Sequence, residues 1–134
     1  MSVTNTVVRR ASLESCGSDD HEDCGLELIL VRLGEQWTVR VLAELAGGPL
    51  RYRVLERALD GISQRMLTLT LRRLERDGHL LRHVEPTVPP KVTYELTELG
   101  HAFATQVATL VEWSRQHKEA INAAQDTFDA SGRD

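Results

Sequence analysis

The sequence has few cysteines, few aromatic residues and no long apolar run. Two cysteines among 134 residues cannot supply the disulfide framework of a small secreted protein, so we expect a cytoplasmic chain. No apolar run approaches the roughly 18 residues of a membrane span, and the opening MSVTNTVVRR lacks the apolar core of a secretory signal. The sequence also lacks a glycine-rich phosphate loop, a nucleophile elbow and a His-Glu-x-x-His spacing, so it indicates neither an enzyme nor a cofactor.

The charge is unevenly distributed along a chain whose length predicts one domain. The net charge is -4, which argues against a nucleic-acid partner when taken alone. Residues 51–91 nevertheless hold nine basic and five acidic side chains, whereas residues 1–50 hold four and eight, and residues 92–134 hold three and seven. Because the local field governs binding to DNA, this basic segment favours a nucleic-acid partner despite the negative net charge. The alternative is a chance cluster of solvated charge.

Residues 63–78 are expected to form an amphipathic helix that ends near Gly78. Ser63 is a good N-cap residue, and Leu67, Leu71 and Leu74 recur at the spacing of one helical face. The opposite face would then present mainly basic and hydroxyl side chains to solvent. Its members are Arg65, Thr68, Leu69, Arg72 and Arg76.

A shorter helix is expected just before it. Tyr52, Leu55 and Leu59 space as an inner face, with the arginines at positions 51, 53 and 57 outside, and Asp60-Gly61 supplies the corner. Two helices joined by a short glycine-containing turn form the helix-turn-helix pattern, whose second helix enters the major groove of DNA. The alternative is an ordinary helical hairpin with a solvated charged face.

Two short strands are expected after Gly78. Residues 80–84 and 92–96 have strand character, and the second segment alternates more cleanly. The connection, residues 85–91, contains three prolines, which stiffen it and remove backbone donors. A hairpin directly after a recognition helix is the wing of a winged helix, and Lys91 could meet the phosphate backbone there. The predicted fold is therefore mainly α with a small β-hairpin wing, a winged helix-turn-helix.

The segments that flank this unit are expected to serve dimerisation or to remain unfolded. Residues 1–23 should form a flexible arm, residues 24–121 the winged domain with its dimerisation helices, and residues 122–134 a frayed tail. A helix from Gly25 to Gly34 is apolar nearly all round, so it should be well buried, by its own chain or by a partner chain. Trp37 lies in a second helix, which Gly47-Gly48-Pro49 ends.

The last helix is expected to begin after Thr97 and to carry an apolar seam. Phe103, Val107, Leu110, Ser114, His117 and Ile121 follow one another at alternating steps of four and three residues. So small a domain has little interior for so long an apolar edge, so we expect a dimer interface, with an intramolecular core as the alternative. The expected interface residues are Leu26, Ile29, Leu30, Phe103, Val107, Leu110, Trp113 and His117.

Three segments together resemble the HxlR family of bacterial winged-helix regulators, relatives of the MarR group. They are Leu50-Arg51-Tyr52 with residues 61–68, residues 71–78 (LRRLERDG), and the wing run of residues 88–100 (VPPKVTYELTELG). The likeness covers about residues 24–117, and Trp113 fits the family's tryptophan near the end. It implies a homodimer that binds a pseudo-palindromic DNA operator, mostly as a repressor and sometimes as an activator.

The chain departs from the family pattern at two points. The family usually has Gly-Gly-Lys-Trp where this chain has Gly34-Glu35-Gln36-Trp37, so a more acidic turn should weaken any DNA contact there. Leu69 replaces a residue that is commonly polar. On the outward face its side chain could pack against a thymine methyl or change operator preference.

Cys24 lies where many family members carry a cysteine, and some of those regulators sense electrophiles, quinones or hypochlorite through that thiol. A helix N-terminus favours the thiolate, but the neighbouring Glu22 and Asp23 oppose it. The alternatives are an inert thiol, a disulfide between Cys16 and Cys24, and an intersubunit disulfide. Zinc binding by Cys16, His21 and Cys24 is disfavoured, because their spacing matches no common finger and a second ligand pair is missing.

The sequence therefore predicts a homodimeric, sequence-specific transcriptional regulator. Base edges should be contacted by Gln64, Arg65, Thr68 and Arg72, and phosphates by Arg51, Arg53, Ser63, Arg76 and Lys91. An electrophile or oxidant is the expected inducer. The alternatives are a winged-helix regulator controlled by a small apolar ligand, and a winged helix used as a protein-interaction module.

Overall fold

The computed structural model describes residues 25–132. These residues belong to two compact units, which meet in sequence between Thr38 and Val39. No helix among the described residues is long and apolar enough to span a membrane.

The first unit contains helix α3 (Leu26–Leu33), which begins after Gly25 in the left-handed region at φ 74° and ends at Gly34. Within this unit the apolar side chains of the helix are largely exposed. Leu28, Leu30 and Val31 are 74%, 53% and 58% exposed, and the one buried side chain of the helix is that of Arg32. An apolar helix that its own unit leaves exposed favours cover by another protein surface, and both expected sources of that cover, its own chain and a partner chain, remain open.

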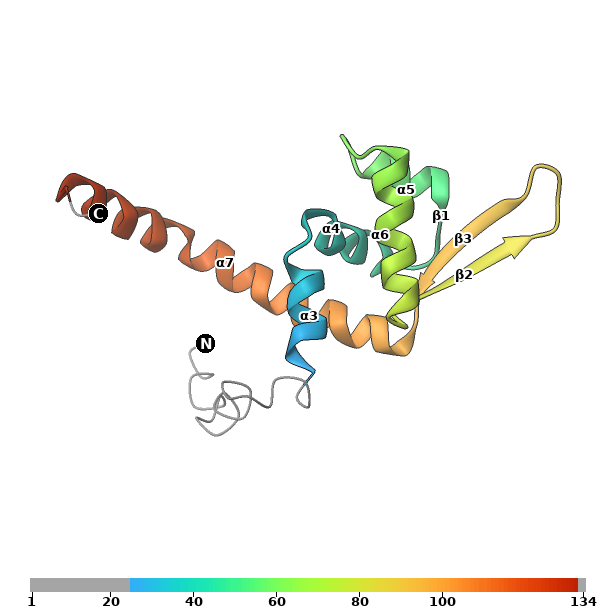
Figure 1. Cartoon of the computed structure of the whole chain (residues 1–134), viewed down its shortest axis with the longest axis horizontal. Helices are drawn as coiled ribbons and strands as arrows, with labels where there is room; N and C mark the ends of the chain where they lie inside the picture. Colours follow the sequence, from blue (N-terminus) through green and yellow to red (C-terminus); the bar gives the residue numbers. More distant parts are fainter. Residues whose placement is uncertain (1–24, 133–134) are drawn as a thin grey trace. The chain divides into compact units, whose positions relative to one another are not determined.

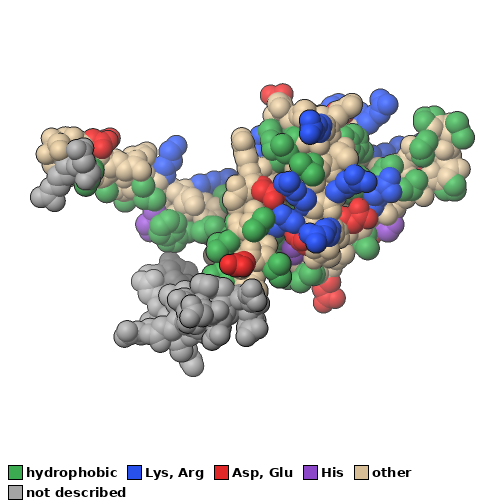
Figure 2. All heavy atoms as spheres, in the orientation of Figure 1, with side chains coloured by type: hydrophobic (Ala, Val, Ile, Leu, Met, Phe, Trp, Pro, Cys, Tyr) green, Lys and Arg blue, Asp and Glu red, His purple; other side chains and the backbone are tan. Residues whose placement is uncertain are grey.

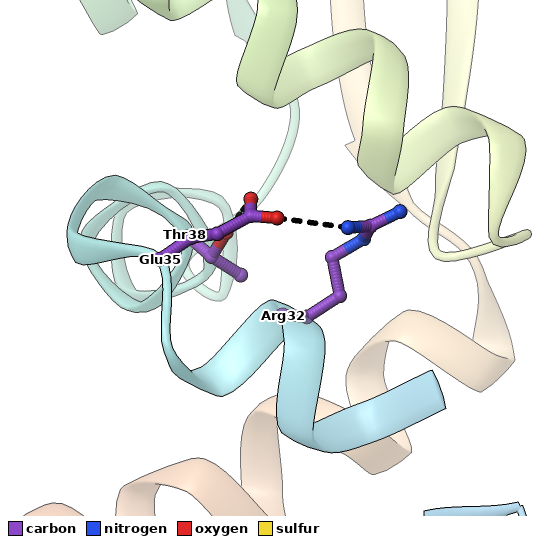
Figure 3. Close-up of polar contacts among 3 residues, drawn as sticks. All are labelled: Arg32, Glu35 and Thr38. Atoms are coloured by element: carbon purple, nitrogen blue, oxygen red, sulfur yellow. Dashed lines mark hydrogen bonds and ion pairs between the residues drawn. The ribbon is translucent and has the colours of Figure 1, made fainter. Parts of the chain in front are cut away.

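Glu35, one of the residues at which the chain departs from the family pattern, stabilises the turn after α3. The Arg32 guanidinium donates to Glu35 Oε1 at 2.8 Å, and the Thr38 hydroxyl donates to Glu35 Oε2 at 3.3 Å (Figure 3). Arg32 is buried and Glu35 is partly buried, so the ion pair is shielded from water more than a surface pair. The charge of Glu35 therefore compensates a buried arginine within the same unit.

The second unit carries a helix-turn-helix followed by a hairpin (Figure 1). Its elements in chain order are α4 (Gln36–Leu45, whose first residues precede the unit boundary), β1 (Leu50–Arg51), α5 (Tyr52–Ala58), α6 (Gln64–Arg76), β2 (Leu80–Glu85), β3 (Lys91–Leu96) and α7 (Glu98–Ala130). The predicted helices and the predicted wing are confirmed. Strand β1 was not predicted, and it places Arg51 in a strand that precedes α5.

The three strands form an antiparallel sheet in the order β1-β3-β2. Leu50 pairs with Tyr94 in the β1–β3 ladder, and Glu85 pairs with Lys91 at the end of the β2–β3 ladder. Lys91 is therefore the residue that closes the wing loop on the β3 side. The loop between the strands, residues 86–90, carries the three prolines and leaves every one of its side chains exposed.

The core of the second unit is almost entirely aliphatic. The leucines at positions 67, 71 and 74 of α6 are at most 1% exposed, which confirms the predicted stripe. They share the interior with residues of α4 and α5 and with the inward side chains of the sheet. These core residues are Val41, Leu42, Leu45, Leu55, Leu59, Leu80, Tyr94 and Leu96. Because the leucine stripe of α6 is buried in this core, the opposite side of the helix faces solvent.

Helix α7 begins where the sequence indicates and ends later than expected. The Thr97 hydroxyl accepts from the backbone N–H of Gly100 at 3.0 Å, as an N-cap does. Gly100 lies against the His79 carbonyl so closely that a Cβ there would overlap it. The helix continues to Ala130, so the frayed tail expected from residue 122 is wrong for residues 122–130. The reason is local: alanines at positions 123, 124 and 130 favour helix, and no glycine interrupts it before Gly132.

Candidate nucleic-acid interface

Helix α6 presents one polar side to solvent because its other side is anchored. The Ser63 hydroxyl accepts from the backbone N–H of Met66 at 3.0 Å, which satisfies a free donor of the first turn. Arg65, Thr68, Leu69 and Arg72 are all exposed, at the spacing of one helical face. In Figure 2, lysine and arginine side chains gather over the region of α6.

These side chains line a shallow hollow, which we call the recognition hollow. It has a volume of about 460 Å³ and is lined by Tyr52, Gln64, Arg65, Thr68, Leu69 and Arg72. The structure thus brings together all five of the residues expected to meet base edges, Leu69 included. Leu69 is 37% exposed, which agrees with its predicted outward position.

Tyr52 links this hollow to α5. Its hydroxyl lies 3.2 Å from the Gln64 carbonyl oxygen and 3.1 Å from the Thr68 hydroxyl. The sequence placed Tyr52 on the inner face of its helix, but the side chain is half-buried and its hydroxyl reaches the polar side of α6. No feature of the sequence pattern signals this contact, because it depends on how α5 crosses α6.

A second hollow, the wing hollow, lies between the start of α5 and the base of the wing. Its volume is about 610 Å³, and Tyr52 lines it as well. The other lining residues are Arg51, Arg53, Val54, Arg57, Pro89, Pro90, Lys91 and Val92. Four basic side chains around one concave surface suit a chain of phosphates. Arg51, Arg53 and Lys91 were expected to contact phosphates, and Arg57 lines the same hollow beside them.

Two of the predicted phosphate contacts lie outside both hollows. Ser63 is the exposed N-cap of α6, and its hydroxyl is engaged by the helix itself. Arg76 is exposed in the last turn of α6, at the far end from that cap. Both residues flank the recognition hollow along the helix without lining it.

The residues expected at the dimer interface divide into two groups. Phe103 and Val107 are buried within the chain, so of the α7 residues expected at the interface only those from Leu110 onward are open to a partner. Leu110 and Trp113 are 50% and 51% exposed, and the Trp113 ring stacks on His117 at 4.5 Å. Leu26 and Leu30 of α3 are exposed as well, and Ile29 is half-buried.

The thiol predictions fall outside the described residues. Cys16 and Cys24, and with them the two disulfide alternatives, precede Gly25, where the described part of the chain begins. The same holds for His21, the third residue of the disfavoured zinc alternative.

The geometry of the helix-turn-helix agrees with comparisons to known proteins. A family model described as HxlR-like helix-turn-helix matches residues 32–122. The HTH-type transcriptional regulator YdeP of Bacillus subtilis is 40% identical over 105 residues, which cover 78% of this chain and 82% of YdeP.

Two solved structures are similar as well. The redox regulator HypR in its reduced form has a TM-score of 0.68 and 36% identity, over 73% of this chain and 97% of HypR. The reduced form of the transcriptional regulator YodB from B. subtilis has a TM-score of 0.61 and 33% identity, over 67% of this chain and 88% of YodB.

Proposed function

Because the chain belongs to the HxlR-like helix-turn-helix family of DNA-binding transcriptional regulators, we propose that two copies of it bind a pseudo-palindromic operator, mainly as a repressor. Each copy places α6 in the major groove of one half-site, and the two half-sites lie about one helical turn apart. Such a protein works in the cytoplasm and acts by occupying DNA rather than by catalysis.

One observation carries this proposal: the outward side of α6 is basic, exposed and backed by a buried leucine stripe. Arg65 and Arg72 are seven residues apart, so both point outward two helical turns from each other. A guanidinium fits the acceptors of guanine in the major groove, and Leu69 between them fits a thymine methyl. The protein-interaction alternative does not require these cations to share one surface.

The wing hollow would hold the phosphate backbone beside the half-site. Arg51, Arg53, Arg57 and Lys91 line it. Among the described residues, none of the four forms an ion pair with a carboxylate. Phosphate contacts of this kind position the protein without reading sequence, and they make binding depend on salt.

The second copy is needed to cover apolar surface that one chain leaves in water. Exposed side chains recur along α7 at Leu110, Trp113, Ile121 and Phe128, between 43% and 51% exposed. The exposed leucines of α3 add a second apolar surface. Helices with such seams pair with one another, and symmetric pairing would set the spacing of the two recognition helices.

For regulation, we propose that Cys24 responds to an oxidant or an electrophile. The support is its place next to Gly25, the N-cap of α3, together with the likeness to the redox regulator HypR. If α3 takes part in the proposed dimer, modification of the residue that precedes its N-cap would change the pairing of the two copies and the spacing of their recognition helices. Control by a small apolar ligand is the competing mechanism.

Selection of bound duplexes from a random pool tests DNA recognition. The wild-type protein should enrich a two-fold symmetric site. Arg65→Ala and Arg72→Ala should each relax one position per half-site, with a loss of about 1–3 kcal/mol for the correct base. Arg115→Ala removes the same charge from an exposed position on α7 and should leave the selected site unchanged. If both α6 variants select the wild-type site, the recognition surface is assigned wrongly.

The redox proposal has its own test. Operator affinity is measured before and after treatment with a quinone or a mild oxidant, for wild type, Cys24→Ser and Cys16→Ser. We expect wild type to lose affinity and Cys24→Ser to be unaffected. A response that survives in Cys24→Ser removes this thiol from the mechanism, and no response in any variant favours the small apolar ligand.

A further inference from the structure

Tyr52 is the one residue that lines both the recognition hollow and the wing hollow. It is the first residue of α5, and its ring is half-buried between that helix and α6. Its hydroxyl makes two contacts with α6, at 3.2 Å to the Gln64 carbonyl oxygen and at 3.1 Å to the Thr68 hydroxyl. These two contacts constrain which hydrogens are left to meet DNA.

The count of hydrogens selects one arrangement of the three oxygens. A tyrosine hydroxyl carries one hydrogen, a threonine hydroxyl carries one, and a carbonyl oxygen carries none. If Tyr52 donated to Thr68, its oxygen would face the Gln64 carbonyl at 3.2 Å with no hydrogen between them. Both contacts become hydrogen bonds only when Tyr52 donates to Gln64 and Thr68 donates to Tyr52.

In that arrangement the Thr68 hydroxyl has no hydrogen left to offer. Thr68 is exposed and lines the recognition hollow, so its oxygen presents only lone pairs to whatever enters there. A free threonine hydroxyl can donate or accept and contributes little to the choice of base. A hydroxyl whose hydrogen is already engaged can only accept.

We propose that Tyr52 is a specificity-determining positioning residue, which makes Thr68 an obligate acceptor toward DNA. This rests on the proposed entry of α6 into the major groove. The bases that offer a donor there are adenine through its N6 amino group and cytosine through its N4 amino group. Guanine O6 and N7 and thymine O4 only accept, and phosphate oxygens carry no hydrogen either. Thr68 therefore meets adenine or cytosine and rejects guanine and thymine at one position of each half-site.

Two substitutions isolate this effect from packing. Tyr52→Phe keeps the ring between α5 and α6 and removes the hydroxyl alone. The Thr68 hydrogen is then free to turn toward DNA, so the hydroxyl can donate as well as accept. Thr68→Val keeps the shape of the side chain and removes the oxygen that would accept.

The experiment compares duplex selections for wild type, Tyr52→Phe, Thr68→Val and the double variant. We expect wild type to enrich adenine or cytosine at one position per half-site, and each single variant to lose about three- to tenfold of that preference. The other positions should keep their preferences. The double variant should lose no more than Thr68→Val alone, because both changes act through one hydrogen bond.

Several outcomes would overturn the inference. They are a Tyr52→Phe variant that keeps the preference, one that weakens all positions equally, and losses that add in the double variant. A preference for guanine or thymine at the position that Thr68→Val relaxes would overturn it too. If wild type enriches no site at all, the proposed function fails and the inference fails with it. If wild type enriches a site and Tyr52→Phe enriches the same one, the proposed function stands and only the role of Tyr52 is lost.

Discussion

Helices α6 and α7 both repeat apolar residues every three or four positions, but their stripes have different surroundings. The stripe of α6, at Leu67, Leu71 and Leu74, is at most 1% exposed. The stripe of α7 is buried only at its start, and from Leu110 to Phe128 its large side chains are about half exposed. Helix α6 thus packs its leucines into the core of its own chain, whereas α7 leaves most of its apolar surface exposed to water.

The difference indicates two kinds of partner. The free side of α6 is basic and hydroxylated, so water solvates it well in the unbound state and a polyanion can replace that water. The free side of α7 is apolar, and an apolar surface of this extent favours another protein surface over water. A single chain therefore carries one outward side suited to DNA and another whose apolar character supports the proposed pairing with a second copy.

The sharpest contrast compares two leucines of α6 that are two residues apart. Leu71→Ala should lower the free energy of unfolding by about 2–5 kcal/mol, because Leu71 is 1% exposed and the space it leaves cannot refill. Leu69→Ala, at 37% exposure, should cost less than about 1 kcal/mol and alter operator choice instead. Urea unfolding of both variants measures the difference. Equal losses would mean that the two sides of α6 are assigned wrongly.

A charge on the stripe of α7 should separate the subunits. Leu110→Glu places a carboxylate in the proposed interface, so we expect monomers in sedimentation equilibrium and operator affinity weaker by at least about 100-fold, since the two half-sites are no longer bound together. The free energy of unfolding of the monomer should change little, because Leu110 is 50% exposed in a single chain.

The matched control for this variant is Gln116→Glu. It adds the same charge to an exposed residue of α7 that lies away from the stripe on the helical wheel. The control should remain dimeric and bind as wild type does. A dimeric Leu110→Glu variant would place the interface elsewhere.

A smaller effect is expected at the end of α7. Phe128 is 47% exposed and continues the four-three spacing of the seam beyond residue 122, where the matched family model ends. Phe128→Ala should weaken dimerisation by about tenfold, the loss typical of one interface aromatic. Asp126→Asn, on the opposite side of the helix, is the control. If dissociation of the Phe128 variant equals that of wild type, the extension of α7 takes no part in pairing.

Much of this architecture was accessible from local sequence signals. The caps Ser63 and Thr97, the leucine stripe of α6 and the proline-rich connection of the wing each depend on neighbours a few residues away, and all are found in the structure. Strand β1 was not predicted, because a strand of two residues is too short to show an alternating apolar pattern. Its Leu50 pairs with Tyr94 of β3, which lies 44 residues later in the sequence. The last turns of α7 are less evident from the sequence, because residues 122–130 are mostly polar even though their alanines favour helix.

The α6 residues that line the recognition hollow were predictable from the sequence as neighbours on one helical face, but their hydrogen bonds were not. The spacing of Arg65, Thr68 and Arg72 sets which side chains share a helical face. The contact of Tyr52 with Thr68, and the addition of Arg57 to the wing hollow, depend on how α5 lies against α6 and the wing. Such crossing geometry follows from tertiary packing, which no short window of sequence encodes.

The smallest expected effect concerns the wing, and it distinguishes a phosphate contact from a base contact. Lys91 is exposed at the base of the wing and lines the wing hollow. Lys91→Ala should weaken binding a few-fold on specific and nonspecific duplexes alike and should reduce the slope of log affinity against log salt by about one, because one fewer counterion is released. Arg115→Ala removes an equal charge from α7 and should leave the slope unchanged. A Lys91 variant that changes which sequence is selected, at constant salt slope, would instead place Lys91 on a base edge and extend the recognition surface from α6 to the wing.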